Sequence, residues 1–252
     1  MNLVIKTIFI LCFVALSVST QAQEITSANV KEMEQKAYKG DVNTQFSVAM
    51  YYWRKAPMTE ETFSKAKAFS KMAAEQGNDN AQLVYGITFE MEKDYKNALI
   101  WFHKAGEQGN GEALYTIARF YTEGHGVKED WGKAFEYYMK SAKQGYDLGM
   151  LWVGNFYLYG LPGIVDKDIY EARKWYEKSA ELGNTRAMVH LAELYIEGTS
   201  VQKNIPTAYS WFKKAIDFGD TDWNEDIAAW RKIADKGNTN YKEFITFYNK
   251  QQ

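Results

Sequence analysis

The sequence has little of three residue types that carry chemistry or constrain the backbone, with one cysteine, three prolines and three histidines in 252 residues. The cysteine, Cys12, lies in an apolar N-terminal stretch, so we expect neither disulfides nor thiol chemistry in the rest of the chain. So few prolines leave long segments free to be helical. A formal net charge of −2 argues against nucleic acid as a partner and against a polybasic membrane-binding patch.

Residues 1–22 have the features of a signal peptide. Lys6 precedes an apolar run from Ile8 to Leu16, and the small or polar residues that follow end in Ala22, where we expect cleavage. An N-terminal membrane anchor is the alternative, but the apolar run is short for a membrane span. The sequence therefore predicts an exported protein, periplasmic or secreted, with no membrane insertion after signal cleavage.

A pattern of glycine, small residue and aromatic residue recurs along the chain. Five times a glycine is followed after nine residues by Ala or Gly and after twelve by Tyr or Phe: Gly40, Ala49, Tyr52; Gly77, Gly86, Phe89; Gly109, Ala118, Tyr121; Gly145, Gly154, Tyr157; Gly183, Ala192, Tyr195. The same glycine position recurs at Gly219. A period of this size indicates stacked supersecondary units that bury a shared core.

Each unit is expected to contain two helices. In the third unit the first helix spans about 112–122 and carries Ala113, Ile117, Ala118 and Tyr121 on one apolar stripe. Eight residues before the next glycine, the second helix has an aromatic residue: Phe69, Trp101, Tyr137, Trp175 or Trp211. Residues that can cap its first turn stand at Thr62, Asp94, Asp130, Asp168 and Asn204. The following glycine supplies the left-handed residue that ends the helix.

The pattern divides the chain into repeats flanked by end helices. The repeats are about 40–76, 77–108, 109–144, 145–182 and 183–218. An N-terminal helix over 27–39 is expected to be capped by Ser27, with Val30, Met33 and Ala37 facing inward. Helices within 222–249 are expected to cover the other end, the first with Ala228 in the small-residue register.

Residues 113–145 spell Ala-x-x-x-hydrophobic-Ala-x-x-Tyr-x-x-Gly-x-Gly-Val-x-x-Asp-x-x-Lys-Ala, then Tyr-Tyr-x-Lys-Ser-Ala-x-x-Gly. This segment resembles the Sel-one-like repeat, a relative of the tetratricopeptide repeat, over roughly residues 40–219. The resemblance implies an all-α, right-handed αα superhelix and a non-enzymatic adaptor role, often in the bacterial envelope. A cysteine-rich branch of the family is associated with β-lactam binding or weak hydrolysis, but this chain lacks that branch's cysteines.

The sequence offers few candidates for chemistry. It contains no nucleophile-elbow, phosphate-loop or paired-cysteine zinc motif, so no catalytic, cofactor or metal residue is predicted. His103 and His125 are interpreted as surface and solvated loop residues. His190, Glu193 and Glu197 share one helical face that could hold a divalent metal, but no second helix offers a matching ligand, and a solvated polar face is the favoured interpretation.

A variable face of the first helices is the better functional candidate. The positions three, seven, ten and fourteen after each repeat glycine lie off the apolar stripe, on what would be the concave side. The predicted partner-binding residues there are Arg119, Glu123, Trp152, Asn155, Tyr159, His190 and Glu193. Glu112 is expected to be exposed on the same face, and Trp152 is expected to have little packing role. The alternative for Trp152 is that it packs on a neighbouring helix.

Two functions from different classes follow. The first is a non-enzymatic adaptor that binds a protein or peptide in the concave groove, since a mixture of tryptophan, tyrosine and arginine is typical of binding hot spots. The second is a weak hydrolase, or a binder of β-lactam or cell-wall glycan, because an acidic chain always offers carboxylate pairs. A dead-end pocket with converging carboxylates would favour the second, and an open groove along several units the first.

Overall fold

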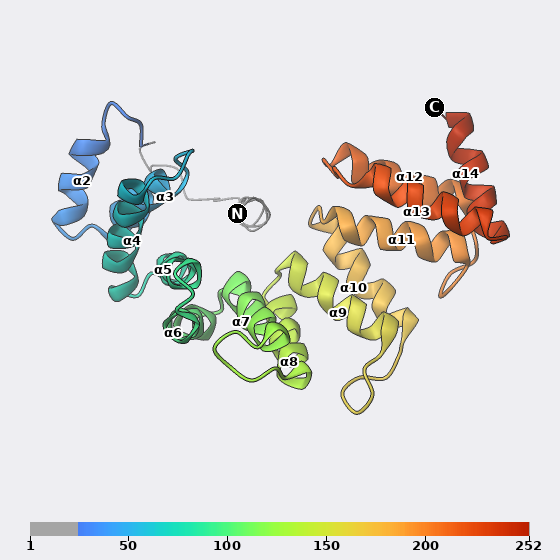
Figure 1. Cartoon of the computed structure of the whole chain (residues 1–252), viewed down its shortest axis with the longest axis horizontal. Helices are drawn as coiled ribbons and strands as arrows, with labels where there is room; N and C mark the ends of the chain where they lie inside the picture. Colours follow the sequence, from blue (N-terminus) through green and yellow to red (C-terminus); the bar gives the residue numbers. More distant parts are fainter. Residues whose placement is uncertain (1–24, 252) are drawn as a thin grey trace.

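The structure is a computed structural model that describes residues 25–251, so the predicted signal peptide lies outside the described residues. These residues form thirteen helices that follow one another along a broad arc, from α2 at one end to α14 at the other (Figure 1). α5 and α7 lie on the inner side of the arc, and α6 and α8 on its outer side (Figure 1). The predicted all-α helix-pair architecture is confirmed.

The helices alternate between the two positions of each repeat. The first helices are α3 (Val42–Trp53), α5 (Asp79–Met91), α7 (Gly111–Glu123), α9 (Asp147–Tyr159) and α11 (Thr185–Glu197). The second helices are α4 (Glu60–Glu75), α6 (Tyr95–Glu107), α8 (Trp131–Lys143), α10 (Ile169–Glu181) and α12 (Ile205–Asp217). The end helices are α2 (Val30–Tyr38), α13 (Trp223–Asp235) and α14 (Thr239–Gln251). Within residues 25–251 no helix is both long and apolar enough to cross a bilayer.

Small residues on the first helices allow close packing against the second helices, as the pattern predicts. Ala118 and Ala192 are completely buried. A Cβ atom added at Gly154 would lie 2.5 Å from the Tyr176 ring, so this position has room for hydrogen alone. We call the aromatic residue eight positions before the next repeat glycine the signature aromatic. In four units the residue directly after it is a fully buried aromatic: Phe102, Tyr138, Tyr176 and Phe212.

Side-chain caps fix where the second helices begin. Asp94, Asp130, Asp168 and Asn204 each accept a hydrogen bond from a first-turn amide, which confirms the prediction at these four positions. The prediction of Thr62 is wrong, because Thr59 is the cap of α4 and Thr62 completes a capping box with it. The glycine after each second helix has positive φ, from 83° at Gly145 to 95° at Gly219.

The N-terminal end helix is shorter than the sequence indicates. α2 begins at Val30, and Ser27 is not its cap, because the Asn29 side chain accepts from the Thr26 amide and residues 27–29 form a turn. Met33 and Ala37 are buried on the inward side, as predicted. The core therefore begins with this helix.

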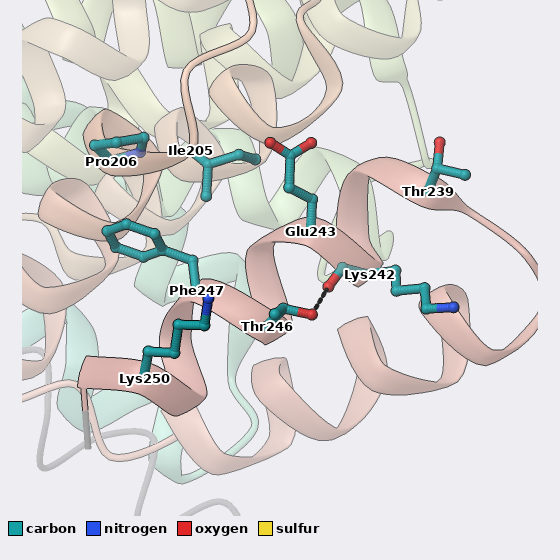
Figure 2. Close-up of a pocket in the computed structure, with 8 residues that line it drawn as sticks. All are labelled: Ile205, Pro206, Thr239, Lys242, Glu243, Thr246, Phe247 and Lys250. Atoms are coloured by element: carbon teal, nitrogen blue, oxygen red, sulfur yellow. Dashed lines mark hydrogen bonds between the residues drawn. The ribbon is translucent and has the colours of Figure 1, made fainter.

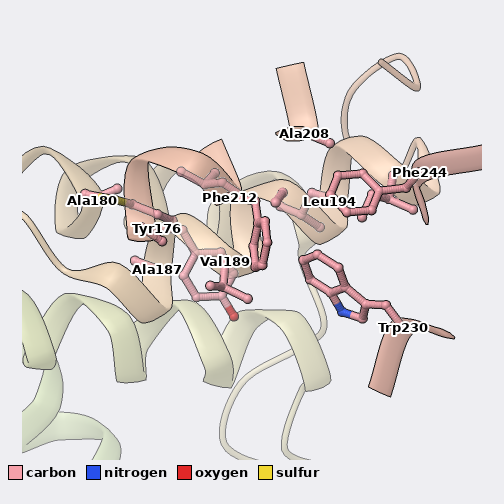
Figure 3. Packing of buried hydrophobic residues seen from close by; sticks show 14 of the residues in the cluster. Tyr176, Ala180, Ala187, Val189, Leu194, Ala208, Phe212, Trp230 and Phe244 are labelled. Atoms are coloured by element: carbon pink, nitrogen blue, oxygen red, sulfur yellow. The ribbon is translucent and has the colours of Figure 1, made fainter. Parts of the chain in front are cut away.

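The C-terminal end helices complete the core of the last repeat. Phe244 and Tyr248 of α14 are buried, so α14 helps to cover this end of the stack, as expected for a helix within 222–249. The expected register of α13 is wrong, because Ala228 is exposed while Ile227 and Trp230 are buried. Figure 3 shows Trp230 beside Phe212 and Phe244, and its ring centroid lies 4.9 Å from that of Phe212 and 5.1 Å from that of Phe244. An aromatic from α13 thus fills the space that a further repeat would occupy.

Candidate partner-binding face

Asparagine caps hold the first helices of the third and fifth repeats in register. Asn110 and Asn184 accept hydrogen bonds from the amides of Ala113 and Ala187. Their own amide groups donate to Asp79 and Asp147, which start the first helices of the preceding repeats. These contacts fix the relative rotation of successive first helices. The inner face is our name for one set of residues on the first helices: those three, seven, ten and fourteen positions after each repeat glycine.

A charged network runs across the inner face between the second and third repeats. The Arg119 guanidinium contacts the Glu90 carboxylate and donates at 3.0 Å to Glu123 Oε2. His125 Nδ1 lies 3.0 Å from the same Glu123 oxygen. His125 also stacks on Tyr95, with ring centroids 4.3 Å apart, so the expectation of a solvated loop residue is wrong. The predicted residues Arg119 and Glu123 are therefore brought together.

Trp152 packs on the aromatic core of the third repeat. Its ring is stacked on that of Tyr138, with centroids 5.1 Å apart and planes 5° from parallel. Burial raises the pKa of the neighbouring Tyr115 hydroxyl, while the charge of Arg119 and a hydrogen bond with Trp152 oppose the rise. The expectation that Trp152 has little packing role is wrong, because the side chain is partly buried against a neighbouring helix. Its part in partner binding stays a prediction.

A chain of contacts links the predicted residues of the fourth and fifth repeats. The Tyr176 hydroxyl donates at 2.8 Å to Asn155 Oδ1, and its ring stacks on His190 with centroids 5.0 Å apart. His190 Nδ1 lies 2.9 Å from Glu193 Oε2, and the Trp230 indole N–H donates at 3.1 Å to Glu193 Oε1. Asn155, His190 and Glu193 therefore form one connected group, which ends on the C-terminal helix α13.

α13 and α14 cover the inner face of the fifth repeat. Besides Trp230, α13 contributes Asp226, whose carboxylate accepts from Arg186 at 2.8 Å. The Tyr241 hydroxyl of α14 donates at 3.1 Å to Glu197 Oε1. Polar residues that the sequence offers as partner contacts in this repeat are thus already bonded within the chain.

The inner face of α7 and α9 is different, because it presents exposed side chains. Tyr159, the last residue of α9, is 72% exposed, and Glu123, the last residue of α7, is exposed as well. Trp152 and Asn155 keep part of their surface accessible, two turns and one turn before Tyr159 respectively. We call Arg119, Glu123, Trp152, Asn155 and Tyr159 the open patch.

Glu112 is a correction to the sequence interpretation. It is 8% exposed rather than open to solvent, and among residues 25–251 its carboxylate has no hydrogen-bond or ion-pair partner. Burial, and to a smaller degree the charge of Asp147, raises the pKa of Glu112 to about 7. An acidic group that is half-ionised near neutral pH therefore lies between α7 and α9.

The structure also shows residues that the sequence pattern does not single out. Glu90 and Tyr115 lie thirteen and six positions after their repeat glycines, outside the positions that define the inner face. Trp230 comes from an end helix, so no repeat register predicts it. Glu90 precedes Arg119 by about one repeat minus one helical turn. This spacing can be recognised as a contact only when the stacking of the repeats is known.

The family model for the Sel1 repeat matches residues 63–78, 83–110, 111–146, 147–184 and 185–220. The chain belongs to the Sel1-repeat family. The Sel1-repeat assignment agrees with the helix pairs described above, and the matched segments include α7, α9 and α11, which carry the predicted partner-binding residues.

Solved and curated proteins resemble this Sel1-repeat chain. A Sel1-repeat protein from Oxalobacter formigenes aligns with a TM-score of 0.69 and 26% identity over 79% of this chain and 58% of its own. The chitin synthase regulator SKT5 of Saccharomyces cerevisiae is 28% identical over 56% of this chain and 19% of its own length. The exopolysaccharide production negative regulator of Rhizobium leguminosarum bv. viciae is 28% identical over 49% of this chain and 52% of its own. This chain therefore spans about half or less of these curated relatives.

The second helices carry a different periodic feature. In four repeats a lysine ammonium lies over the signature aromatic ring three residues before it, with distances to the ring centroid from 3.8 Å to 5.0 Å: Lys104 on Trp101, Lys140 on Tyr137, Lys178 on Trp175 and Lys214 on Trp211. The lysines therefore cover these four aromatic rings through cation–π contacts, whereas the Tyr159 ring of the open patch is left exposed.

A shallow depression lies beside the C-terminal helix α14. Its volume is about 480 Å³, and Figure 2 shows Ile205 and Phe247 at its apolar side with Lys242, Glu243 and Lys250 around it. Glu243 accepts from Lys203 at 2.8 Å, so this carboxylate is paired. Across the described part of the chain, no group of three or more His, Cys, Asp or Glu residues is placed to hold a metal ion.

Proposed function

We propose that this chain is a non-enzymatic adaptor of the bacterial envelope or secreted space, and that it binds a protein or peptide through the open patch of α7 and α9. The observation that carries the proposal is the contrast between repeats. The inner face of α11 is covered by α13 and α14, whereas α7 and α9 leave Tyr159 exposed and Trp152 and Arg119 partly accessible. Aromatic residues and arginine on one accessible surface are typical of binding hot spots.

The family supports this function. Stacked helical repeats create extended surfaces suited to binding other proteins, and the yeast and rhizobial relatives are named as regulators of chitin synthase and of exopolysaccharide production. A regulator changes the activity of another component, which requires contact with it or with an intermediary. Components of a polysaccharide-producing system are therefore the first partners to test for this chain.

The location rests on the N-terminal sequence. The apolar run from Ile8 to Leu16 and the small residues before Gln23 support export with cleavage after Ala22. Mass spectrometry of the protein recovered from the producing cells should find Gln23 at the N-terminus. Recovery of a chain that still begins at Met1 would contradict export by cleavage.

Photocrosslinking tests the binding surface directly. A photoreactive phenylalanine analogue replaces Tyr159 in one variant and Tyr170 in another, since Tyr170 at the start of α10 is similarly exposed at 64%. Irradiation of producing cells should yield a discrete crosslinked protein from position 159 and none from position 170. Equal products from both positions, or none from position 159, would overturn the proposal.

A further inference from the structure

The two arginines on the inner face of α7 and α11 are outnumbered by the carboxylates that hold them. Arg119 contacts both Glu90 and Glu123. Arg186 is paired with Asp226 at 2.8 Å and with Asp222 at 3.7 Å. Each guanidinium carries one positive charge and faces two carboxylates, so each group keeps a net negative charge at neutral pH.

Other carboxylates on or beside the inner face have no cationic partner. Asp147 accepts from the Asn184 amide group at 2.7 Å, and Glu197 accepts from the Tyr241 hydroxyl. Both donors are neutral, and within the described chain neither carboxylate lies within ion-pair distance of a lysine or arginine. The first helices α7, α9 and α11 therefore carry carboxylates that lack a full cationic complement, while lysine ammonium groups lie over aromatic rings of the second helices.

Glu112 adds a second, independent observation. The Glu112 residue is 8% exposed, so its carboxylate keeps a little contact with solvent, and among residues 25–251 it has no hydrogen-bond or ion-pair partner. A buried carboxylate without a partner is costly, whereas one that is paired and hydrogen-bonded is not. The charge of Asp147 acts on it across the α7–α9 interface. The pair has the chemistry that a lysine or arginine side chain would satisfy.

The open patch supplies the apolar part of such a contact. The exposed ring of Tyr159 and the accessible edge of Trp152 lie along α9, the helix that Asp147 begins. Aromatic faces attract ammonium and guanidinium groups and also pack against their aliphatic stems. One helix thus offers a carboxylate at its start and aromatic rings farther along.

We propose that the inner face of α7 and α9 binds a basic peptide segment of a partner protein, with a lysine or arginine placed near Glu112 and Asp147 and apolar groups against Trp152 and Tyr159. This inference rests on the proposed function and specifies the chemistry of the partner. The occupant is an extended cationic segment, because the face combines unpaired carboxylates with aromatic rings along two adjacent first helices.

A library of random dodecapeptides displayed on phage, selected on the purified chain, tests the inference. Enriched peptides should carry net positive charge, and fluorescence anisotropy should show their affinity falling about tenfold or more between 50 and 500 mM NaCl. Glu112→Gln should weaken binding about tenfold by removing the charge without changing the shape. Glu136→Gln on the outer side of α8 is the matched control and should leave binding unchanged.

The variants at Tyr159 and Tyr170 separate the two proposals. Cationic peptides that lose affinity with Tyr159→Ala but not with Tyr170→Ala support both. Neutral or acidic peptides that are sensitive to Tyr159→Ala would overturn the inference and leave the proposed function standing. Enrichment of no peptide sensitive to Tyr159→Ala would overturn both.

Discussion

The inner faces of α11 and α9 lie at the same positions of the repeat, but their side chains have different contacts. On α11, Glu193 accepts from the Trp230 indole and Arg186 is paired with Asp226, both of which come from α13. On α9, Trp152 lies on Tyr138 of the preceding repeat and Tyr159 is exposed. The same face is an internal interface at the C-terminal end and an accessible surface in the middle.

This difference shows that a variable position is not by itself a binding position. The last repeat of a stack has no successor, so an end helix must cover its core. α13 does this with Trp230, which lies between Phe212 and Phe244 and reaches Glu193 on the inner face (Figure 3). On α11 the variable residues contact α13, whereas on α9 Tyr159 contacts no end helix and stays exposed.

The largest effect is expected from Trp230→Ala. Trp230 is 2% exposed, and its removal leaves a cavity among aromatic side chains. The substitution should lower the free energy of unfolding by about 3–5 kcal/mol, measured by urea denaturation. Trp131→Ala is the control, since Trp131 is 40% exposed, and it should cost about 1 kcal/mol or less. Equal losses would mean that α13 does not close the core.

Glu112→Gln is expected to stabilise the protein, with a dependence on pH. The pKa of Glu112 in the folded protein is raised from 4.5 to about 7, so the folded state holds its proton more tightly than the unfolded state. Stability is therefore lost as the pH rises from about 4.5 to 7. The variant, which cannot ionise, should be more stable than wild type by up to about 3 kcal/mol at pH 8.

The same variant should bring little gain at pH 4, where Glu112 is protonated in both states. Urea denaturation at pH 4 and pH 8 measures the difference. A gain that is equal at the two pH values would show that the side chain's ionisation is not the cause. A loss at pH 8 would indicate that the Glu112 carboxylate has a stabilising partner in the folded chain.

Trp152→Ala should have an intermediate effect. Its ring stacks on Tyr138, but part of its surface is accessible, so we expect a loss of about 1–3 kcal/mol in the free energy of unfolding. The loss for Trp152→Ala should be smaller than that for Trp230→Ala, because Trp152 is less buried than Trp230. A loss as large as that of Trp230→Ala would place Trp152 in the core, and no loss would mean that the stacking contributes nothing.

Tyr159→Ala should change stability least, by about 0.5 kcal/mol or less, because 72% of the side chain is exposed. Thermal denaturation should give nearly the same midpoint for this variant, Tyr170→Ala and wild type. A clear drop for Tyr159→Ala alone would show that this ring is part of the packing between α9 and α10.

Local chemistry made most of the fold predictable. Asp94, Asp130, Asp168 and Asn204 cap their helices because a carboxylate or amide oxygen can reach the first-turn amides whatever lies around it. The small residue at Gly154 is fixed by the Tyr176 ring it faces. Such features repeat with the unit and are therefore visible in one sequence.

The site was less predictable because its contacts join residues from different units. Glu112 is buried because α9 packs against α7, and nothing in its own helix indicates this. Trp230 meets Glu193 across 37 residues, and no register of the repeat relates the two.

The most direct test follows the tryptophan indole N–H signals by NMR while a peptide selected on the purified chain is added. The chain has eight tryptophans, which give separable reporters on the open patch, the covered face and the outer side. We expect the Trp152 signal to shift along a saturating curve that is half-complete at the peptide's dissociation constant, while the Trp230 and Trp175 signals stay in place. A shift of Trp230 or Trp175 with Trp152 unchanged would contradict this expectation.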